Sequence, residues 1–297
     1  MQTPVRQVPC LIVNADDFGY FRCVSRGILK AAAEGIVTAT GVLANAEGFA
    51  EQAAWLKDRE DLDAGVHLNA TYGMPLTADL RRKLRGSSER FPGKFPMAMK
   101  LLARVIGVAD VEREWRAQIE RCLEQGLLLR FLNSHEHIHM LPPLFPVAQS
   151  LASEYGIEHV RFPTAQQTTG PGAGALLRAT IMKTLDAANR GRLSAPVPRF
   201  LGLESSGRLG EPEIERIVAG LSAGDVGELM CHPGEFDPAE VNDPRLLGYH
   251  DWVGELRALT GSRVREALHR FGVRLVGYRH LSVEGGRLVP RAVAAPA

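Results

Sequence analysis

The chain alternates between two hydrophobic patterns. Short apolar runs, several of them rich in β-branched side chains, are typical of buried strands. Between them lie segments whose apolar positions recur with helical spacing. The order begins strand, helix, strand, helix, strand, which favours parallel strands joined by crossover helices. The expected strands are residues 8–13, 36–44, 62–68, 127–132, 158–162, 197–203, 226–231 and 273–276, and the expected helices are 24–34, 46–57, 111–125, 142–155, 175–189, 211–221 and 253–271.

Residues 70–110 interrupt this rhythm with three prolines, a basic patch at 81–85 and a short amphipathic piece at 95–106. A connection of this length usually carries function, so we expect it to form a cap over a site. Its basic and apolar residues could touch a lipid surface. The simpler interpretation is that they pack the cap onto the rest of the fold, because mixed charge and apolar spacing is normal for a surface helix.

The remaining segments lack a regular pattern. Residues 164–174 and 246–252 are expected to be loops, and residues 284–297 a loose tail. The length of 297 residues allows one large α/β domain or two small ones. Because neither an internal repeat nor a linker is evident, we expect one domain over residues 1–297.

Composition is that of an ordinary soluble protein, with 45% hydrophobic and 23% charged residues. The net charge of +1 indicates no global basic field for nucleic acid or an acidic membrane. No apolar stretch approaches the roughly 20 residues of a membrane span, and no secretory signal is evident. Cys10, Cys122 and Cys231 lie in apolar runs, as reduced core cysteines do. These features favour a cytoplasmic location.

Polar side chains follow four of the expected strands. Asp16 and Asp17 follow the first strand, His67 ends the third, and His232 follows the strand at 226–231. A histidine-rich segment, residues 133–139, follows the strand at 127–132. One histidine at a strand end is commonly a partner of nearby backbone. Four such signatures on one edge of a parallel sheet indicate an active site, since sites in barrels of parallel strands are built there.

The histidine-rich segment has His135, His137 and His139 at alternate positions. In an extended segment these side chains would lie on one face and could converge on a metal ion. A polar loop with surface histidines is the competing interpretation, and spacing alone does not decide between them.

The four signatures together suit a mononuclear metal hydrolase. One carboxylate and two imidazoles leave a coordination position open for water, as in catalytic sites. A second carboxylate can take a proton from that water, and a further histidine can protonate a leaving amine. Asp16 and Asp17 offer one carboxylate for each task. Neighbouring strand side chains point to opposite sides, so the backbone must turn there, which Phe18–Gly19 would permit.

Four motifs resemble the YdjC-like carbohydrate deacetylases, a family that includes chitooligosaccharide deacetylases and hopanoid-associated members. They are NADDFG at 14–19, GVHLN at 65–69, NSHEHIHM at 133–140 and ELMCHPG at 228–234, in the order of the family. The flanking sequences also resemble the family: GIVTATGVLAN at 35–45, and the prolines and LFP that follow the histidines. The match is specific because no single motif carries it.

The resemblance implies a distorted (β/α) barrel of parallel strands of the polysaccharide-deacetylase type. It implies removal of an N-acetyl group from an amino sugar, with release of acetate. It also implies one divalent metal ion held by Asp17, His67 and His135. By the same resemblance Asp16 is the catalytic base, and His232 is the acid or stabilises the transition state.

Four further residues are expected to contact substrate or to support the metal ligands: Asn69, Glu136, His137 and His139. For His137 and His139 the surface-loop interpretation also stays open. Many relatives have Asp-Ser-His-His-His-Val-His in this segment, whereas here Asn133 replaces the aspartate and Glu136 the middle histidine. Metal preference or substrate could therefore differ.

Several alternatives stay open. A deformylase, or another amide hydrolase acting on a lipid-linked sugar, would use the same centre. A non-catalytic carbohydrate-binding relative would not need a base beside the metal. A phosphoesterase would usually need two metal ions. The sequence does not fix the metal, since zinc, cobalt, nickel, manganese and magnesium all accept such ligands. It also leaves open the sugar, a lipid carrier and a homodimer.

Overall fold

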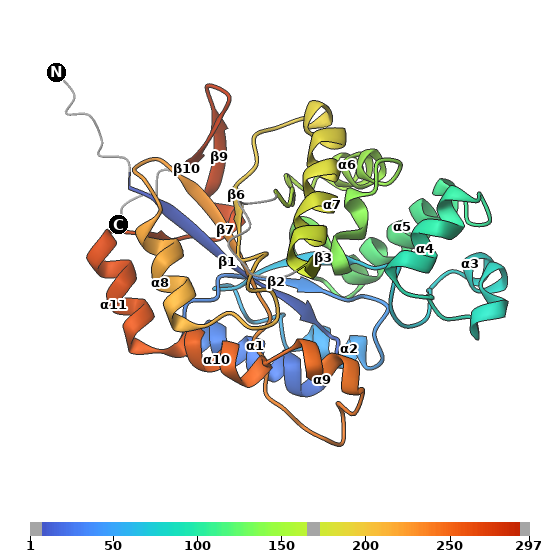
Figure 1. Cartoon of the computed structure of the whole chain (residues 1–297), viewed down its shortest axis with the longest axis horizontal. Coiled ribbons are helices and arrows are strands. Elements are labelled where there is room, and N and C mark those ends of the chain that lie inside the picture. The colour runs from blue at the N-terminus through green and yellow to red at the C-terminus, as the bar shows by residue number, and fades with distance from the viewer. Residues whose placement is uncertain (1–7, 165–172, 292–297) are drawn as a thin grey trace.

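The computed structural model describes residues 8–164 and 173–291, which form one domain around a single curved sheet (Figure 1). Its strands are parallel and lie in the order β5-β4-β3-β2-β1-β7-β6, with β8 also paired to β1. The strands are β1 (Cys10–Phe18), β2 (Ala39–Val42), β3 (Asp63–Leu68), β4 (Leu129–Ser134), β5 (His159–Val160), β6 (Arg199–Leu201), β7 (Val226–Cys231) and β8 (Arg274–Leu275).

The strand β1 lies at the centre of the sheet. All nine of its residues are buried, as expected for a strand covered on both faces. On one side it pairs with β7 from Cys10 to Ala15. On the other side β8 pairs with its first residues and β2 with its later ones. The C-terminal end of β1 therefore lies deep within the fold, between β2 and β7.

The sheet is curled into a distorted, open barrel. Arg161 directly follows β5, yet its Nε donates a 2.5 Å hydrogen bond to Oε1 of Glu228 on β7. Four strands separate β5 from β7 in the sheet, so this contact requires the two ends to approach each other. The barrel expected from the resemblance is thus confirmed.

Helices cover the outside of the barrel, with α1, α8, α10 and α11 along one side and α5–α7 on another (Figure 1). Each buries the apolar face that the sequence pattern indicates; α1, for example, buries Val24, Ile28 and Ala31. The helices are α1 (Arg22–Glu34), α2 (Phe49–Ala54), α3 (Ala78–Lys83), α4 (Lys94–Leu102), α5 (Val108–Glu124), α6 (Phe145–Glu154), α7 (Ala173–Asn189), α8 (Glu211–Ala219), α9 (Pro244–Tyr249), α10 (Trp252–Thr260) and α11 (Ser262–Phe271).

Three expectations near the C-terminus are wrong. Residues 246–252 are not all loop, because α9 covers most of them. The single helix expected at 253–271 is two helices that meet at Gly261, where a Cβ atom would lie 2.1 Å from Oε1 of Glu211. The tail expected from residue 284 begins as a hairpin of β9 (Leu281–Glu284) and β10 (Arg287–Pro290). Residues 292–297 lie outside the described part.

Residues 70–110 contain α3, α4 and a short 3₁₀ turn, and they pack beside α5. The carboxylate of Glu114 on α5 accepts hydrogen bonds from the backbone of Leu76 and Thr77. Lys83 forms a 2.6 Å ion pair with Asp110. These contacts attach the segment to the barrel through α5, and its role as a cap stays a prediction. Most of the expected loop at 164–174 lies outside the described residues.

The cysteines match their expected state, since Cys10, Cys23, Cys122 and Cys231 are all buried and free. Among the described residues, no helix is both long enough and apolar enough to span a bilayer.

Candidate metal centre

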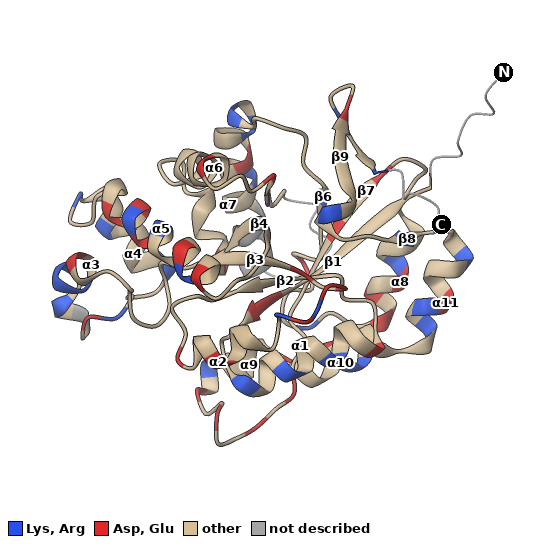
Figure 2. Ribbon diagram, turned by 180° about the vertical axis from the view of Figure 1, so that it is seen from behind, with Lys and Arg blue, Asp and Glu red and all other residues tan. Residues whose placement is uncertain are grey.

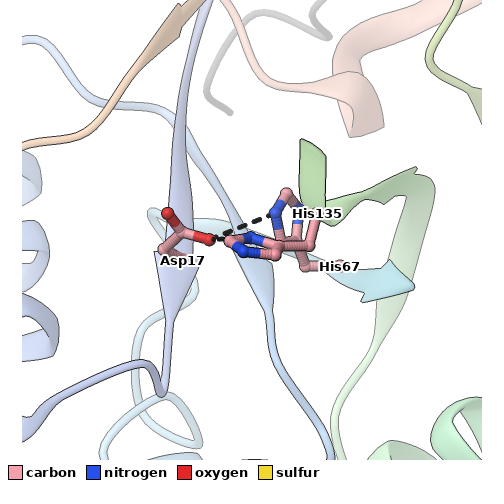
Figure 3. Close-up of side chains that lie close together, drawn as sticks. All are labelled: Asp17, His67 and His135. Atoms are coloured by element: carbon pink, nitrogen blue, oxygen red, sulfur yellow. Dashed lines mark hydrogen bonds and ion pairs between the residues drawn. The ribbon is translucent and has the colours of Figure 1, made fainter. Parts of the chain in front are cut away.

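Asp17, His67 and His135 meet where β1, β3 and β4 end (Figure 3). Oδ1 of Asp17 lies 2.8 Å from Nδ1 of His135 and 3.3 Å from Nε2 of His67. One ligand atom from each residue lies within 4.8 Å of the others, so a single metal ion could contact all three. Asp17 and His67 are buried, and the His135 side chain is 13% exposed. The structure therefore brings together the three residues predicted to bind metal.

The backbone of Asp17 explains how two adjacent carboxylates enter one site. Its φ is 71°, in the left-handed region that costs free energy for residues other than glycine. The register of β1 against β2 shifts between Ala15 and Phe18, as at a β-bulge. The turn anticipated at Phe18–Gly19 thus already begins at Asp17. This irregularity replaces the strict alternation that would separate the two carboxylates.

His67 is held by an amide that determines which ring nitrogen carries a proton. Its Nδ1 lies 2.7 Å from Oδ1 of Asn133, whose Nδ2 donates to Oδ1 of Asp16 at 2.9 Å. Since the amide oxygen can only accept, His67 carries its proton on Nδ1 and presents a lone pair on Nε2. Gly41 makes room for this pair, because a Cβ atom there would lie 2.9 Å from Asn133 Oδ1 and 3.0 Å from His67 Nδ1.

This arrangement fits a divalent cation. The lone pair of His67 Nε2 faces the Asp17 carboxylate at 3.3 Å, and two such acceptors are stable together when a cation lies between them. Burial would raise the pKa of Asp17, but His135 and His67 outweigh it, and the pKa lies well below its ordinary value. One ionised carboxylate and two imidazoles form the donor set of a catalytic divalent site.

Asp16 lies in a different pocket, beside the only fully buried arginine in the described part of the chain. Nη1 and Nη2 of Arg161 lie 2.5 Å and 2.9 Å from Oδ2 and Oδ1 of Asp16. Burial would raise the pKa of Asp16, but the charge of Arg161 opposes it, and the pKa lies below its ordinary value. Glu228 pairs with the Nε side of the same guanidinium at 2.5 Å. Asp16 is thus an ionised carboxylate held in one orientation.

Sequence reasoning missed Arg161 and Glu228. A signal was present, because each is a charged residue within an expected strand: Arg161 lies in 158–162, which also begins with Glu158, and Glu228 is the one charged residue of 226–231. A charge in a strand buried on both faces needs a partner. The opposite charges of the two residues and their positions in the sequence did not indicate that these two strands, distant in the sheet, would supply partners for each other.

The histidine-rich segment is not extended, so its three imidazoles do not converge. It forms a 3₁₀ stretch (His135–Met140) in which Glu136 and His137 have φ of 52° and 54°. The ring of His137 meets Phe200 edge-on at 5.5 Å, and its Nδ1 is buried without a hydrogen-bond partner among the described residues. The convergent metal site suggested by alternate spacing is therefore wrong, and His135 alone reaches Asp17.

His139 is a supporting residue. It is 0% exposed, which rules out the surface-loop interpretation for this side chain. Its Nε2 donates to the carbonyl of Arg161 at 2.9 Å, and its Nδ1 accepts from the hydroxyl of Ser134 at 2.5 Å. Burial lowers the pKa of His139 to about 4, so the ring is neutral. It links the end of β4 to the end of β5 and thereby positions Arg161.

Asn69 and Glu136 have different surroundings. Asn69 is fully buried, and its side chain bonds to Asn45 and to the backbone of Thr71 and Tyr72. Of its two expected roles, only support is compatible with this geometry. Glu136 is exposed and forms a 2.9 Å ion pair with Lys94 at the start of α4.

The loop shaped by Asn69 places Tyr72 beside the metal ligands. The rings of Tyr72 and Tyr20 lie 4.4 Å apart, and they lie 6.2 Å and 5.5 Å from the ring of His135. Tyr20 is 9% exposed and Tyr72 37% exposed. Both rings thus lie close to His135, and Tyr72 is the more exposed of the two.

His232 follows β7 and is 8% exposed. Its backbone N–H donates a 2.6 Å hydrogen bond to Glu255, whose pKa is raised by burial. The ring lies 5.2 Å from that of His250, which stacks on Trp252. Nδ1 of His232 is buried and has no hydrogen-bond partner among the described residues.

Comparison with known proteins finds relatives along most of the chain. A model of the YdjC-like protein family matches residues 10–270. A carbohydrate deacetylase of Brevibacillus brevis is 30% identical over 91% of this chain and 99% of its own length. A second carbohydrate deacetylase, from Geobacillus stearothermophilus, is 31% identical over 90% of this chain and 96% of its own.

Among solved structures, an Enterococcus faecalis protein provisionally assigned to cellobiose-phosphate cleavage superposes with a TM-score of 0.68. It is 23% identical and covers 92% of this chain and 98% of its own. This likeness supports the fold.

Proposed function

Because the chain belongs to the YdjC-like protein family, we propose that it is a metal-dependent hydrolase that removes the N-acetyl group of an amino sugar. The reaction consumes water and releases acetate and the free amine. The relatives named carbohydrate deacetylase support the substrate class. The observation that carries the proposal is the cluster of Asp17, His67 and His135 with the second carboxylate, Asp16, beside it.

Asp17, His67 and His135 would hold one divalent ion. Such an ion lowers the pKa of bound water and polarises an amide carbonyl. The residues around the cluster keep its ligand atoms in the protonation states that metal binding requires. Asn133 holds the His67 proton on Nδ1, and the two neighbouring imidazoles lower the pKa of Asp17, so that its carboxylate is ionised. Zinc, magnesium, cobalt, nickel and manganese all suit these donors, and metal loading tests which one supports activity.

Asp16 acts as the general base. The bidentate contact with Arg161 keeps the Asp16 carboxylate ionised and fixes its orientation, and Asn133 donates a further hydrogen bond to Oδ1. In the reaction Asp16 takes a proton from the attacking water, so that the new C–O bond forms as the proton leaves. Arg161 remains charged throughout and compensates the buried carboxylates of Asp16 and Glu228.

His232 assists departure of the amine. When the C–N bond breaks, the sugar nitrogen must gain a proton, and a protonated imidazole can donate it. The backbone bond to Glu255 and the ring contact with His250 hold His232 at the end of β7. Asp16 then passes the proton it has taken to His232 or to solvent, so that both residues return to their starting protonation states.

A deformylase, or another amide hydrolase on a lipid-linked sugar, is the alternative within the same chemistry. A non-catalytic binding protein is less consistent with the structure. Burying the charged, oriented carboxylate of Asp16 costs free energy, and metal binding alone does not require that carboxylate.

A substrate panel tests the proposal. The metal-loaded protein would be incubated with chitobiose-type oligomers, N-acetylglucosamine, lipid-linked N-acetylhexosamines and the corresponding N-formyl sugars. We expect acetate release from at least one N-acetyl sugar, abolished by a chelator and restored by added metal. Formate release without acetate release would favour the alternative, and no acyl release from any substrate would contradict both.

A further inference from the structure

One face of α4 carries large apolar side chains exposed to solvent. Phe95, Met99 and Leu102 recur with helical spacing and are 64%, 63% and 77% exposed. On the other face Met97 is fully buried, and Leu101 packs against the core. A helix that is apolar on two faces normally has a partner for each. The inner face of α4 packs on its own domain, whereas the outer face is open in the described part of the chain.

The apolar surface continues past the end of α4. Val105 and Val108 are 52% and 36% exposed. Five of the sixteen large apolar residues exposed in the described part therefore fall between residues 95 and 108. Figure 1 shows α3 and α4 at one end of the molecule, beyond α5. Large exposed apolar side chains concentrated in one stretch of the chain mark an interaction site more often than scattered single residues do.

The same end of the molecule is basic. Residues 78–109 contain eight Lys and Arg residues but two Asp and Glu residues, whereas the whole chain has 35 and 34. Figure 2 shows Lys and Arg on α3. Arg82 and Arg85 have side chains that are 62% and 71% exposed. The net charge of +1, which argued against an acidic membrane as partner, therefore conceals a strongly basic segment.

We infer that the outer face of α4, together with the basic residues of 78–109, is a docking surface for an anionic lipid membrane. Apolar side chains flanked by Lys and Arg insert at the boundary between headgroups and acyl chains, while the cations attract anionic headgroups. The surface lies on the membrane and does not cross it, in keeping with the absence of a membrane-spanning helix among the described residues.

A second copy of the chain is a poorer occupant. A two-fold dimer through this surface would place the patch against itself and bring two segments rich in Lys and Arg together. Like charges brought together across an interface oppose association. Residues 165–172, outside the described part, are also a poor cover, because they are Ala, Gln, Thr, Gly and Pro without a large apolar side chain.

The docking surface borders the candidate metal centre. Lys94, the first residue of α4, pairs with Glu136, which directly follows the proposed ligand His135. A membrane bound at α4 would therefore lie beside the loop that carries the centre.

Vesicle co-sedimentation tests the inference on the full chain without substrate, so its outcome is independent of the proposed deacetylation. We expect binding to phosphatidylcholine vesicles that contain phosphatidylglycerol, weak binding to phosphatidylcholine alone, and release by salt. Leu102→Glu should lower the partition coefficient about tenfold. Leu128→Glu is the matched control, because Leu128 is 75% exposed and directly precedes β4, outside the docking surface.

A second pair of variants tests the charge. Arg82→Glu with Arg85→Glu should weaken binding by about fivefold or more for each charge. Arg216→Glu with Arg263→Glu, at side chains 59% and 68% exposed on α8 and α11, should leave binding unchanged. Unaltered thermal unfolding would show that all variants fold.

Three outcomes would overturn the inference. One is no binding to any vesicle. Another is equal loss of binding in Leu102→Glu and its control Leu128→Glu. The third is an oligomer of the wild-type chain that Leu102→Glu dissociates, which would make a second copy the occupant.

Discussion

Asp16 and Asp17 are neighbours in sequence, but they lie in two pockets with different electrostatics. Among the described residues, the close partners of the Asp17 carboxylate are two imidazoles, which are groups that can also bind a metal. The pocket of Asp16 contains Arg161, a fixed cation that cannot give up its charge. A carboxylate beside imidazoles that can bind a metal suits metal coordination. A carboxylate beside an arginine, which keeps its charge and binds no metal, suits proton transfer. Environment, rather than residue type, thus separates the two roles.

The largest effect is expected in the Asp17 pocket. Asp17→Asn removes the only anionic ligand, so the metal affinity should fall about a hundredfold or more and activity should fall with it. Metal content after dialysis, measured by mass spectrometry beside acetate release, checks this. If Asp17→Asn keeps wild-type metal content, the cluster is not the metal site.

The Asp16 pocket should be the more sensitive for stability. Arg161→Met leaves Asp16 and Glu228 buried without their cation and should lower the free energy of unfolding by about 3–5 kcal/mol. Urea unfolding measures the loss. Arg161→Met combined with Glu228→Gln should be less destabilised than Arg161→Met alone, because one uncompensated charge is gone. Equal stability of the single variant and the wild type would mean that the guanidinium does not neutralise this pocket.

The stabilising effect of His139, which connects the ends of β4 and β5, should depend on pH. The pKa of His139 is about 4 in the folded state, below the unfolded value of about 6.5. Between these values the unfolded state binds more protons, so stability falls as the pH is lowered through this window. The contribution should be about 2 kcal/mol between pH 6.5 and pH 5. Unfolding titrations should show a shallower pH dependence for His139→Gln and an unchanged one for His269→Gln, at an exposed position of α11.

The smallest effect is expected just outside both pockets. Glu136 forms an ion pair with Lys94 at the protein surface, with side chains 30% and 46% exposed. Pairs of this kind contribute at most about 1 kcal/mol. Glu136→Gln should therefore change the free energy of unfolding by less than about 1 kcal/mol and leave metal content unchanged. A clear loss of metal in this variant would extend the metal site beyond its three proposed ligands.

The sequence pattern was sufficient to predict parallel strands with crossover helices and the edge on which the candidate site lies, and the family resemblance added the barrel. Buried apolar runs fix strands, and the polar residues after them mark the C-terminal edge. Details that depend on one residue escaped prediction. The left-handed backbone of Asp17 and the break at Gly261 follow from tertiary contacts that no periodicity reveals.

Two misses had a readable signal. The hairpin of β9 and β10 contains Gly285-Gly286 between alternating residues, which is a recognised two-residue turn pattern. Arg161 stood as a charge in a buried strand. The sequence could show that it needed partners, but only the curl of the sheet determines that Asp16 and Glu228 are those partners.

Asp16→Asn tests the separation of the two pockets most directly, with bound metal and acetate release measured on the same sample. The predicted result is near-normal metal content with acetate release reduced by about 10²–10⁴-fold, because the base is lost while the Asp17 cluster is kept. Deacetylation at the wild-type rate, or a loss of metal as large as that of Asp17→Asn, would contradict the assignment.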